Sequence, residues 1–415
     1  MRNIRTGFFL FCWSILFIPT GKLFAFSGDS LLSKDSLNTA EADFRLPKPH
    51  VARNYIRPCV YVNYFTTGSN PTRGTLHPFY DKGIDAHLGN YKFSEANLGL
   101  YVPLYTHTKF VGSDSTDINT FHLLMTMNGL SDMPDFTGLA KQHKLYKLGV
   151  GARIIYGFGS RFVLFYDASP YVVGDRYNSQ QTQQFRLASS VVLNIMVNPY
   201  FSWRIGATKT YLFGNRNYLP MIGFRAGKLD SKFYFSFQLP RYISFNFQPT
   251  PKFSWSIYSR AYGGLYNMSN GDSIYNGRDS AIRFGQTGLA NGVRLDFRTG
   301  PDFSFFVSSG FAVNNVIRFY SFSYNHDHNQ QPFIPFYKSR QDPTLFLNFG
   351  LTWRFGESKR STGNYLMYDI FSLNNDFDPG DNNMGPGNGD ITPKEQMKKV
   401  QYKDVVDLID DTDLY

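Results

Sequence analysis

Apolar and polar side chains alternate along most of this chain. In the clearest run, residues 344–355, large apolar residues occupy every odd position from Leu345 to Phe355, and the even positions are mostly small or polar. The same alternation recurs at 185–197, 201–207, 233–239, 243–247 and 253–257. A period of two places successive side chains on opposite faces of a β-strand, so these segments predict strands with one apolar and one polar face.

The composition of the second face separates two kinds of β-protein. A soluble sandwich would carry many Lys, Glu and Asp on its outer face, whereas here the second face is mainly Ser, Gly, Asn, Thr, Tyr and Arg. Segments of about ten alternating residues separated by turn residues are typical of a transmembrane β-barrel. The pattern therefore predicts an all-β fold, an antiparallel up-and-down transmembrane barrel over residues 55–355.

Turn residues divide this region into fourteen expected strands. They cover 55–66, 91–103, 118–129, 144–157, 161–172, 184–197, 200–212, 218–228, 232–239, 242–248, 252–266, 281–298, 302–320 and 344–355. Short and long connectors alternate along most of the series, as in a barrel whose termini share one side. Two places depart from this: Leu239-Pro240-Arg241 must form a tight outer turn, and 104–117 a long inner connector. Twelve or sixteen strands remain compatible with the sequence.

The composition excludes other classes of protein. The chain has 41 Phe and 28 Tyr but only 18% charged residues, an aromatic content that excludes disorder over its whole length. Its two cysteines, Cys12 and Cys59, are too few for a disulfide scaffold. Apart from the run at 7–18, no apolar stretch approaches the roughly 18 to 20 residues of a membrane-spanning helix, which excludes a helical membrane protein.

The N-terminal segment predicts export. Arg2 and Arg5 precede the apolar run, and Ala25 and Ser27 supply the small residues that a signal peptidase reads, so residues 1–27 are expected to be a signal peptide. Cleavage there would leave Cys59 as the one thiol, a small apolar filler in a strand. Residues 28–54 are polar and are expected to form a periplasmic segment before the barrel.

The C-terminal region differs from the barrel in composition. Residues 356–390 are rich in Asn, Asp, Gly and Pro and are expected to be a flexible linker. Residues 391–415 form an acidic tail, in which Thr392-Pro393-Lys394-Glu395 predicts the start of a short helix. Its acidic cluster is Asp404, Asp407, Asp410, Asp411 and Asp413. The tail could plug the barrel, bind a periplasmic protein or stay disordered, and the sequence does not choose among these.

The net charge of +10 combines two opposed parts. Residues 356–415 hold twelve acidic and six basic residues, a net charge of −6, so the rest of the chain is strongly basic. Such asymmetry can indicate nucleic-acid binding, but an exported, strand-rich chain has no basic helix or zinc module for it. We therefore expect no nucleic-acid partner.

Charged side chains on the strands are expected inside the barrel, because a charge facing lipid is costly. If the apolar faces contact lipid, six arginines form a basic lumen cluster near the inner ends of their strands: Arg153, Arg161, Arg204, Arg225, Arg294 and Arg354. Lys147, Arg186, Arg260 and Arg318 are expected higher in the lumen, with Glu95, Asp167 and Asp296 as the main acids. A basic ring favours anions, whereas an internal Arg–Asp–Tyr network would merely fill the barrel.

Catalytic and metal-binding patterns are weak. His122 lies within a strand beside Thr126 and Asn128 and has no serine partner at a recognisable spacing. His326 and His328 flank one aspartate in a polar loop and have no third ligand. We expect no catalytic residues, no metal site and no cofactor, with a lipid-modifying barrel enzyme as a distant alternative.

Several short motifs support a family resemblance. With Leu219-Pro220, Leu239-Pro240-Arg241 and Gly263-Gly264, the chain resembles an uncharacterised family of outer-membrane β-barrels common in Bacteroidota. The resemblance implies a bacterial outer-membrane location with periplasmic termini, and it brings no assigned activity. Phe355 resembles the terminal aromatic of the signal read by the outer-membrane assembly machinery, so that machinery and outer-membrane lipid are expected partners.

Two functions remain open at this point. The first is a pore or transporter for small anionic or polar solutes with a basic lumen. The second is a non-conducting structural subunit of an envelope assembly that binds a periplasmic partner through its acidic tail.

Overall fold

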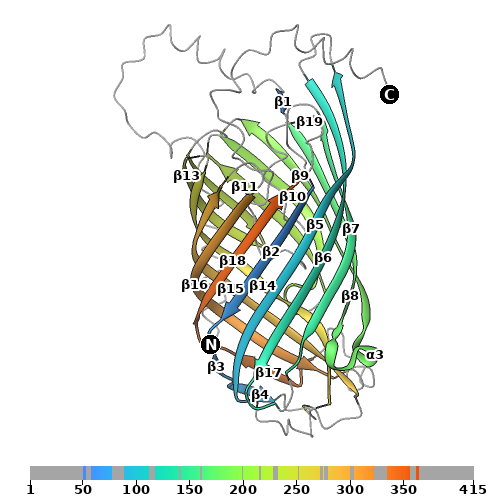
Figure 1. Ribbon diagram of the computed structural model, residues 1–415, viewed down its shortest axis with the longest axis vertical. Coiled ribbons are helices and arrows are strands. Elements are labelled where there is room, and N and C mark those ends of the chain that lie inside the picture. Colours follow the sequence, from blue (N-terminus) through green and yellow to red (C-terminus); the bar gives the residue numbers. More distant parts are fainter. Residues whose placement is uncertain are drawn as a thin grey trace. The chain divides into compact units, whose positions relative to one another are not determined.

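The computed structural model (Figure 1) describes the barrel and parts of its connections. The described residues are 50–52, 58–76, 88–111, 117–139, 142–158, 161–198, 200–214, 216–227, 232–250, 252–271, 274, 279–299, 303–321, 334–355 and 361–363. Within them, fourteen strands form one closed antiparallel up-and-down barrel. They are β2 (Cys59–Thr67), β5 (Asn90–Val111), β6 (Asp117–Phe136), β7 (Leu145–Phe158), β8 (Phe162–Asp175), β9 (Gln184–Asn198), β10 (Phe201–Thr210), β11 (Asn217–Ala226), β12 (Phe233–Leu239), β13 (Tyr242–Thr250), β14 (Phe253–Ser269), β15 (Ala281–Arg298), β16 (Phe303–Tyr320) and β18 (Thr344–Arg354).

The predicted strand count and pairing scheme are confirmed. Neighbours in sequence pair along the barrel, and β18 closes it against β2 with Gly350 opposite Asn63. Pro240 and Arg241 form the tight turn between β12 and β13, which the fourteen-strand scheme required. Short strands β3 (Asn70–Pro71), β4 (Gly74–Leu76) and β17 (Tyr337–Arg340) extend the wall at one rim. Helical structure in the described residues is limited to η1 (Arg176–Asn178) and α3 (Ser179–Thr182).

The expected long inner connector at 104–117 is wrong. β5 continues to Val111 and β6 begins at Asp117, and these two residues pair with each other. The pairing register shifts between Pro103 and Tyr105, so Leu104 is an extra residue in the ladder. Such a bulge interrupts the period of two, which explains why the alternation signal ended at residue 103.

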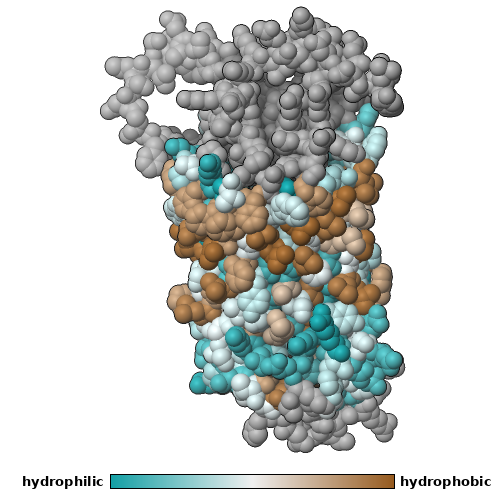
Figure 2. Space-filling view, in the orientation of Figure 1, coloured by the Kyte–Doolittle hydropathy of each residue, from teal (hydrophilic) through white to brown (hydrophobic). Residues whose placement is uncertain are grey.

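The two rims of the barrel differ. At the rim called here the short-turn end, the connections at 199–200, 251–252 and 299–302 are only a few residues long; the opposite rim is called the loop end. Outward-facing apolar side chains such as Leu347, Phe349 and Trp353 are about half exposed. Figure 2 shows the apolar band nearer the short-turn end and hydrophilic side chains nearer the loop end. Among the described helices, none has the length and apolarity to cross a membrane.

Toward the loop end the interior is filled by a hydrophobic cluster, called here the loop-end core. Its side chains are nearly inaccessible and come from most of the long strands: Phe65, Leu88, Tyr91, Phe93, Phe136, Leu145, Tyr258, Tyr262, Tyr266, Met268, Ile274, Ile282, Phe284, Ala290, Ala312, Ile317, Phe319, Phe336, Tyr337 and Phe346. Aromatic side chains therefore pack densely in this part of the barrel interior.

Strand β14 helps to build this closure. On the loop-end side of the β12–β13 turn, Ala261–Ser269 pairs in the ladder with β15 alone. The reason is that β13 begins at Tyr242, the partner of Arg260, and has no residues beyond it. Both faces of this segment are buried, and it contacts β7 and β8. Gly263 has a φ of 123°, and a Cβ there would lie 2.3 Å from the Gln286 carbonyl oxygen, so only glycine fits. We infer from these contacts that β14 bends into the lumen at Gly263.

The expected terminal regions fall mostly outside the described residues. These are the signal peptide 1–27, most of the segment 28–54, the linker 356–390 and the acidic tail 391–415, including Asp404, Asp407, Asp410, Asp411 and Asp413. Two short pieces pair as a separate sheet, β1 (His50–Ala52) with β19 (Ser361–Gly363).

Candidate functional site

The structure divides the six predicted lumen arginines into groups. Arg153 and Arg294 each form a 2.6 Å ion pair, with Asp167 and Asp296 respectively. Their charges are therefore neutralised within the wall.

The other four occupy different settings. Arg354 is largely buried at the end of β18, opposite Cys59. Arg161 is exposed in the connection before β8. Arg204 and Arg225 lie buried on β10 and β11.

Arg204 and Arg225 belong to two neighbouring lines of paired residues across β10–β14, called here the arginine rows. The first row is Arg204, Gly223, Gln238, Tyr242 and Arg260; the second is Ser202, Arg225, Ser236, Ser244 and Tyr258. All ten positions are buried, whereas residues beside them in sequence, such as Ile222 and Ile243, are exposed. The rows therefore face the lumen.

Side chains of the first row converge although their backbones are well separated. Arg204 Nη1 donates to Tyr242 Oη at 2.9 Å, three strands away, and more weakly to Ser236 Oγ at 3.3 Å and Gln238 Oε1 at 3.4 Å. Gly223 stands between Arg204 and Gln238 in this row, and a Cβ there would lie 2.4 Å from the Phe237 carbonyl oxygen and 3.2 Å from the Gln238 Cβ. The three acceptors of Arg204 named here are uncharged side chains.

Aromatic rings support the other two arginines of the rows. The Arg225 guanidinium lies 4.1 Å from the Tyr234 ring centroid, and the Arg260 guanidinium 5.2 Å from the Phe65 centroid. A cation over an aromatic face gains attraction without losing its charge. The rings therefore help to orient these arginines.

The wall that carries the rows is poor in acidic residues. Between Phe201 and Ser269 the sequence contains one acidic residue, Asp230, and it lies outside the described residues. Acids on the other described strands are Glu95 on β5, Asp132 on β6, Asp167 and Asp175 on β8 and Asp296 on β15. Glu95 is the register partner of Phe65, and Arg260 lies over the Phe65 ring.

Sequence reasoning missed several members of this site. Arg260 was expected higher in the lumen, yet it shares a row with Arg204. Gln238, Tyr242 and the buried Arg241 were not considered as site residues. The period of two at 233–247 did contain the signal for Gln238, which occupies a polar-face position two residues after Ser236. The side-chain convergence itself depends on a long-range register that alternation does not reveal.

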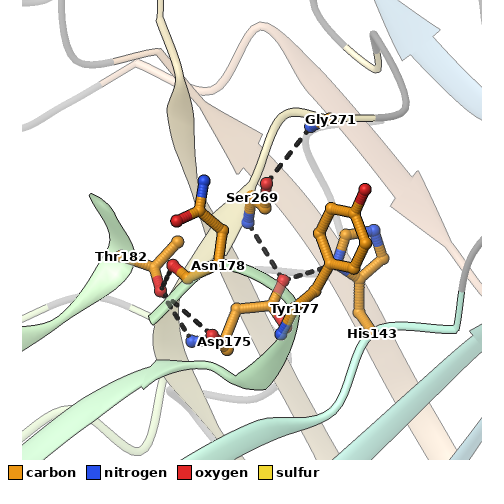
Figure 3. A network of polar contacts seen from close by, with 7 residues as sticks. All are labelled: His143, Asp175, Tyr177, Asn178, Thr182, Ser269 and Gly271. Carbon is orange, nitrogen blue, oxygen red and sulfur yellow. Dashed lines mark hydrogen bonds and ion pairs between the residues drawn. The ribbon is translucent and has the colours of Figure 1, made fainter. Parts of the chain in front are cut away.

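A second polar cluster fastens β14 at the loop end, as Figure 3 shows. Asp175 lies 2.5 Å from His143 Nδ1 and accepts hydrogen bonds from the backbone N–H groups of Ser269 and Tyr177, each at 3.0 Å. Asn267 Nδ2 donates to the Thr182 carbonyl at 3.1 Å. Burial acts to raise the pKa of Asp175, but the bonds from His143, Ser269 and Tyr177 outweigh it, and the pKa lies below its ordinary value of 3.8.

The histidines considered as catalytic or metal-binding candidates find little support in the structure. His122 is buried and shares a 3.2 Å hydrogen bond with Thr106. His326 and His328 lie outside the described residues. In the part of the chain that the structure describes, no group of three or more His, Cys, Asp or Glu residues is arranged to hold a metal ion.

A family model now connects this barrel to related sequences. The model described as "Domain of unknown function (DUF6268)" matches residues 142–354, which span β7 to β18 and both arginine rows. The chain belongs to the DUF6268 family. No curated protein matches it.

Solved structures similar to this DUF6268 protein have low sequence identity to it, and they include an outer membrane channel. The COG4313 outer membrane channel from Pseudomonas putida F1 has 10% identity and a TM-score of 0.32, with 72% of this chain and 96% of that chain covered. A Pseudomonas aeruginosa FadL homologue has 9% identity, coverage of 72% and 91%, and a TM-score of 0.26. LpxR from Salmonella typhimurium has 10% identity, coverage of 72% and 100%, and a TM-score of 0.27. Similarity at this level indicates nothing about the activity of this chain.

Proposed function

We propose that this DUF6268 protein is a bacterial outer-membrane barrel that passes small anionic or polar solutes. The observation that carries the proposal is the pair of arginine rows inside a closed barrel, on a wall without a described acid. A basic constriction attracts anions and repels cations. The exposed apolar band supports membrane insertion, and the short turns support a periplasmic position for that rim and for the termini.

The loop-end core adds a condition to this proposal. Because aromatic side chains fill that part of the interior, passage requires the core or β14 to move, so we propose gated rather than continuous conduction. The test is a planar-bilayer recording of the purified protein under a salt gradient. Current steps whose reversal potential favours anions support the proposal. The triple variant Arg204→Gln, Arg225→Gln, Arg260→Gln should lose the anion preference while the barrel still inserts.

The loop-end core also favours a second candidate, a non-conducting barrel that serves as a subunit of an envelope assembly. In that case the acidic tail would bind a periplasmic protein. A silent bilayer, together with a periplasmic partner that co-purifies with the full chain and not with a chain ending at Phe355, would support this candidate over a pore.

We further propose that the protein is not an enzyme. Incubation of the purified barrel with labelled phospholipid tests this, and release of a labelled fatty acid or transfer of an acyl chain would contradict it.

A further inference from the structure

We infer that the outer face of β4, β17 and the loop-end part of β16 binds phosphate-bearing headgroups of membrane lipid. Four basic residues carry this inference and are called here the rim patch: Arg73, Arg318, Lys338 and Arg340. The inference rests on the proposed function only for the placement of the barrel in a membrane. It goes beyond that function because it names a lipid partner and the residues that contact it.

The neighbours of the patch residues show which face of the sheet is the outer one. Ile317, Phe319 and Tyr337 belong to the loop-end core, so their side chains point into the barrel. Successive side chains on a strand point to opposite faces, so the residues between and beside them point outward. Lys338 and Arg340 are exposed, in agreement with this assignment.

Strand pairing brings Arg73 to the same place from a distant part of the sequence. The ladder between β4 and β17 ends with Gly74 opposite Ser339. The backbones of the next residues, Arg73 and Arg340, are therefore neighbours at the end of this ladder, and both residues are exposed. Lys338 lies two residues from Arg340 on the same face, so three basic side chains share a small area.

Arg318 reaches the outer face because of a bulge in β16. The alternation predicts Arg318 inside the lumen, but the pairing of β16 with β15 shifts between Thr287 and Leu289, where β16 has one extra residue. An extra residue inverts the alternation beyond it. Arg318 is therefore on the outer face, beside its register partner Lys338.

The strands that carry the patch contain basic residues and no acidic ones. The sequences of β4, β16 and β17 include no Asp or Glu, and Asp342 follows two residues after β17. The outer face of β5 and β6 differs, because Lys92 there lies directly opposite Asp135. The rim patch is thus a local excess of positive charge on the outer surface, which attracts anionic lipid headgroups.

The side chains of the patch suit phosphate groups. Arg340 Nη2 donates to Asn314 Oδ1 at 2.8 Å, a bond that orients the guanidinium. A guanidinium has several donors in a planar fork, so this bond leaves others for phosphate oxygens. Exposed lysine and arginine side chains also lie along apolar surface while their charged ends reach the headgroups.

The patch lies close to the loop-end edge of the apolar band. Phe311 and Leu345 are register partners on β16 and β18, and they are 56% and 62% exposed. Arg340 is paired with Val316, which is further along β16 toward the loop end. At the usual rise and tilt of barrel strands, Val316 lies roughly 13 Å beyond Phe311 along the barrel axis. Headgroups border the hydrocarbon at this side of the band.

The experiment measures lipid contact at the patch itself, with the full chain inserted in vesicles. A bimane fluorophore is attached to Phe311→Cys in a Cys59→Ala background, and lipids with brominated acyl chains quench it. At low ionic strength, half-quenching should need at least about 3-fold less brominated phosphatidic acid than brominated phosphatidylcholine. The difference should disappear at high ionic strength, because salt screens exposed charges.

Two matched triple variants test the residues. The patch variant, which should lose the preference for phosphatidic acid, is Arg73→Gln, Lys338→Gln, Arg340→Gln. The control variant, which removes three exposed charges at the short-turn end and should keep the preference, is Arg161→Gln, Lys232→Gln, Lys252→Gln. A third variant with Arg73→Lys and Arg340→Lys keeps the charge and should also keep the preference. Heat-modifiable mobility on gels shows that each variant is folded.

The outcomes separate this inference from the pore. Equal quenching by the two lipids in the otherwise unchanged chain, or a preference that survives in the patch variant, would overturn the rim patch and leave conduction untouched. A preference that depends on the patch, together with a silent bilayer, would keep the patch and reject the pore. Failure of the chain to insert into vesicles would reject the membrane placement on which both rest.

Discussion

Gly223 shows how one missing side chain shapes the lumen. It stands between Arg204 and Gln238 in the first arginine row. An alanine Cβ at this position would lie 2.4 Å from the Phe237 carbonyl oxygen, a distance that forces the β11–β12 ladder to shift.

We therefore expect Gly223→Ala to destabilise the barrel by about 1–3 kcal/mol. The control is Gly129→Ala, whose Cβ would meet only the Leu148 side chain at 3.3 Å and should be tolerated. Thermal unfolding in detergent measures the difference between the two variants. Equal melting temperatures for the two variants would show that Gly223 has no steric role.

A second residue-scale effect concerns the paired arginines. Arg153 and Asp167 are both about 1% exposed, whereas the Arg294–Asp296 pair is 7% and 14% exposed. Removing one member of a fully buried pair leaves an uncompensated charge, which costs about 3–5 kcal/mol. Asp167→Asn should therefore destabilise the barrel markedly more than Asp296→Asn, as compared by urea unfolding; the opposite ranking would contradict this account of burial.

At the scale of elements, β14 is the strand that alternation describes only in part. Its first half, up to Arg260, lies in the wall and has one exposed and one buried face; its second half is buried on both faces. Asp175 fastens the far end through the Ser269 backbone N–H, and His143 is the other titratable group that faces this carboxylate.

This fastening should depend on pH. Because the folded-state pKa of Asp175 is lowered, its carboxylate stabilises the fold fully above pH 3.8, and this contribution is lost as the pH falls through the lowered pKa. We expect Ser269 amide exchange to accelerate in wild type only below about pH 4. Asp175→Asn should exchange rapidly already at neutral pH, with amides in the wall half of β14 as internal controls. Slow exchange in this variant would show that Asp175 does not hold β14.

The strands illustrate what the sequence can and cannot predict. Outward positions such as Leu347 and Trp353 follow from a period of two. The number of strands followed from placing a turn at Pro240, which divides residues 232–248 into two strands. The bulge at Leu104 hid the ends of β5 and β6, because one extra residue inverts the alternation. The inward bend of β14 was hidden for a different reason: a strand with two buried faces depends on contacts with β7 and β8 that are distant in sequence.

At the scale of the whole molecule, the charge asymmetry connects the barrel to its acidic tail. The linker and the tail together carry a net charge of −6 over residues 356–415, and the arginine rows lie on a wall that has no described acidic residue from Phe201 to Ser269. Of the six arginines predicted to form the lumen cluster, Arg153 and Arg294 are already neutralised by aspartates. Arg204, Arg225 and Arg260 are the basic side chains of the arginine rows.

We propose on this basis that the tail occupies the rows when no anionic solute is bound. Individual ion pairs between exposed groups are worth under about 1 kcal/mol, so the contact should weaken as salt screens it. A chain ending at Phe355 should then carry a larger current in planar bilayers than the full chain at low ionic strength and the same current at high ionic strength. The control is a full-length chain with Asp404, Asp407, Asp410, Asp411 and Asp413 changed to Asn, which should match the truncated chain. Currents that are the same with and without the tail at every ionic strength would remove the tail from the lumen and leave it as a partner-binding arm.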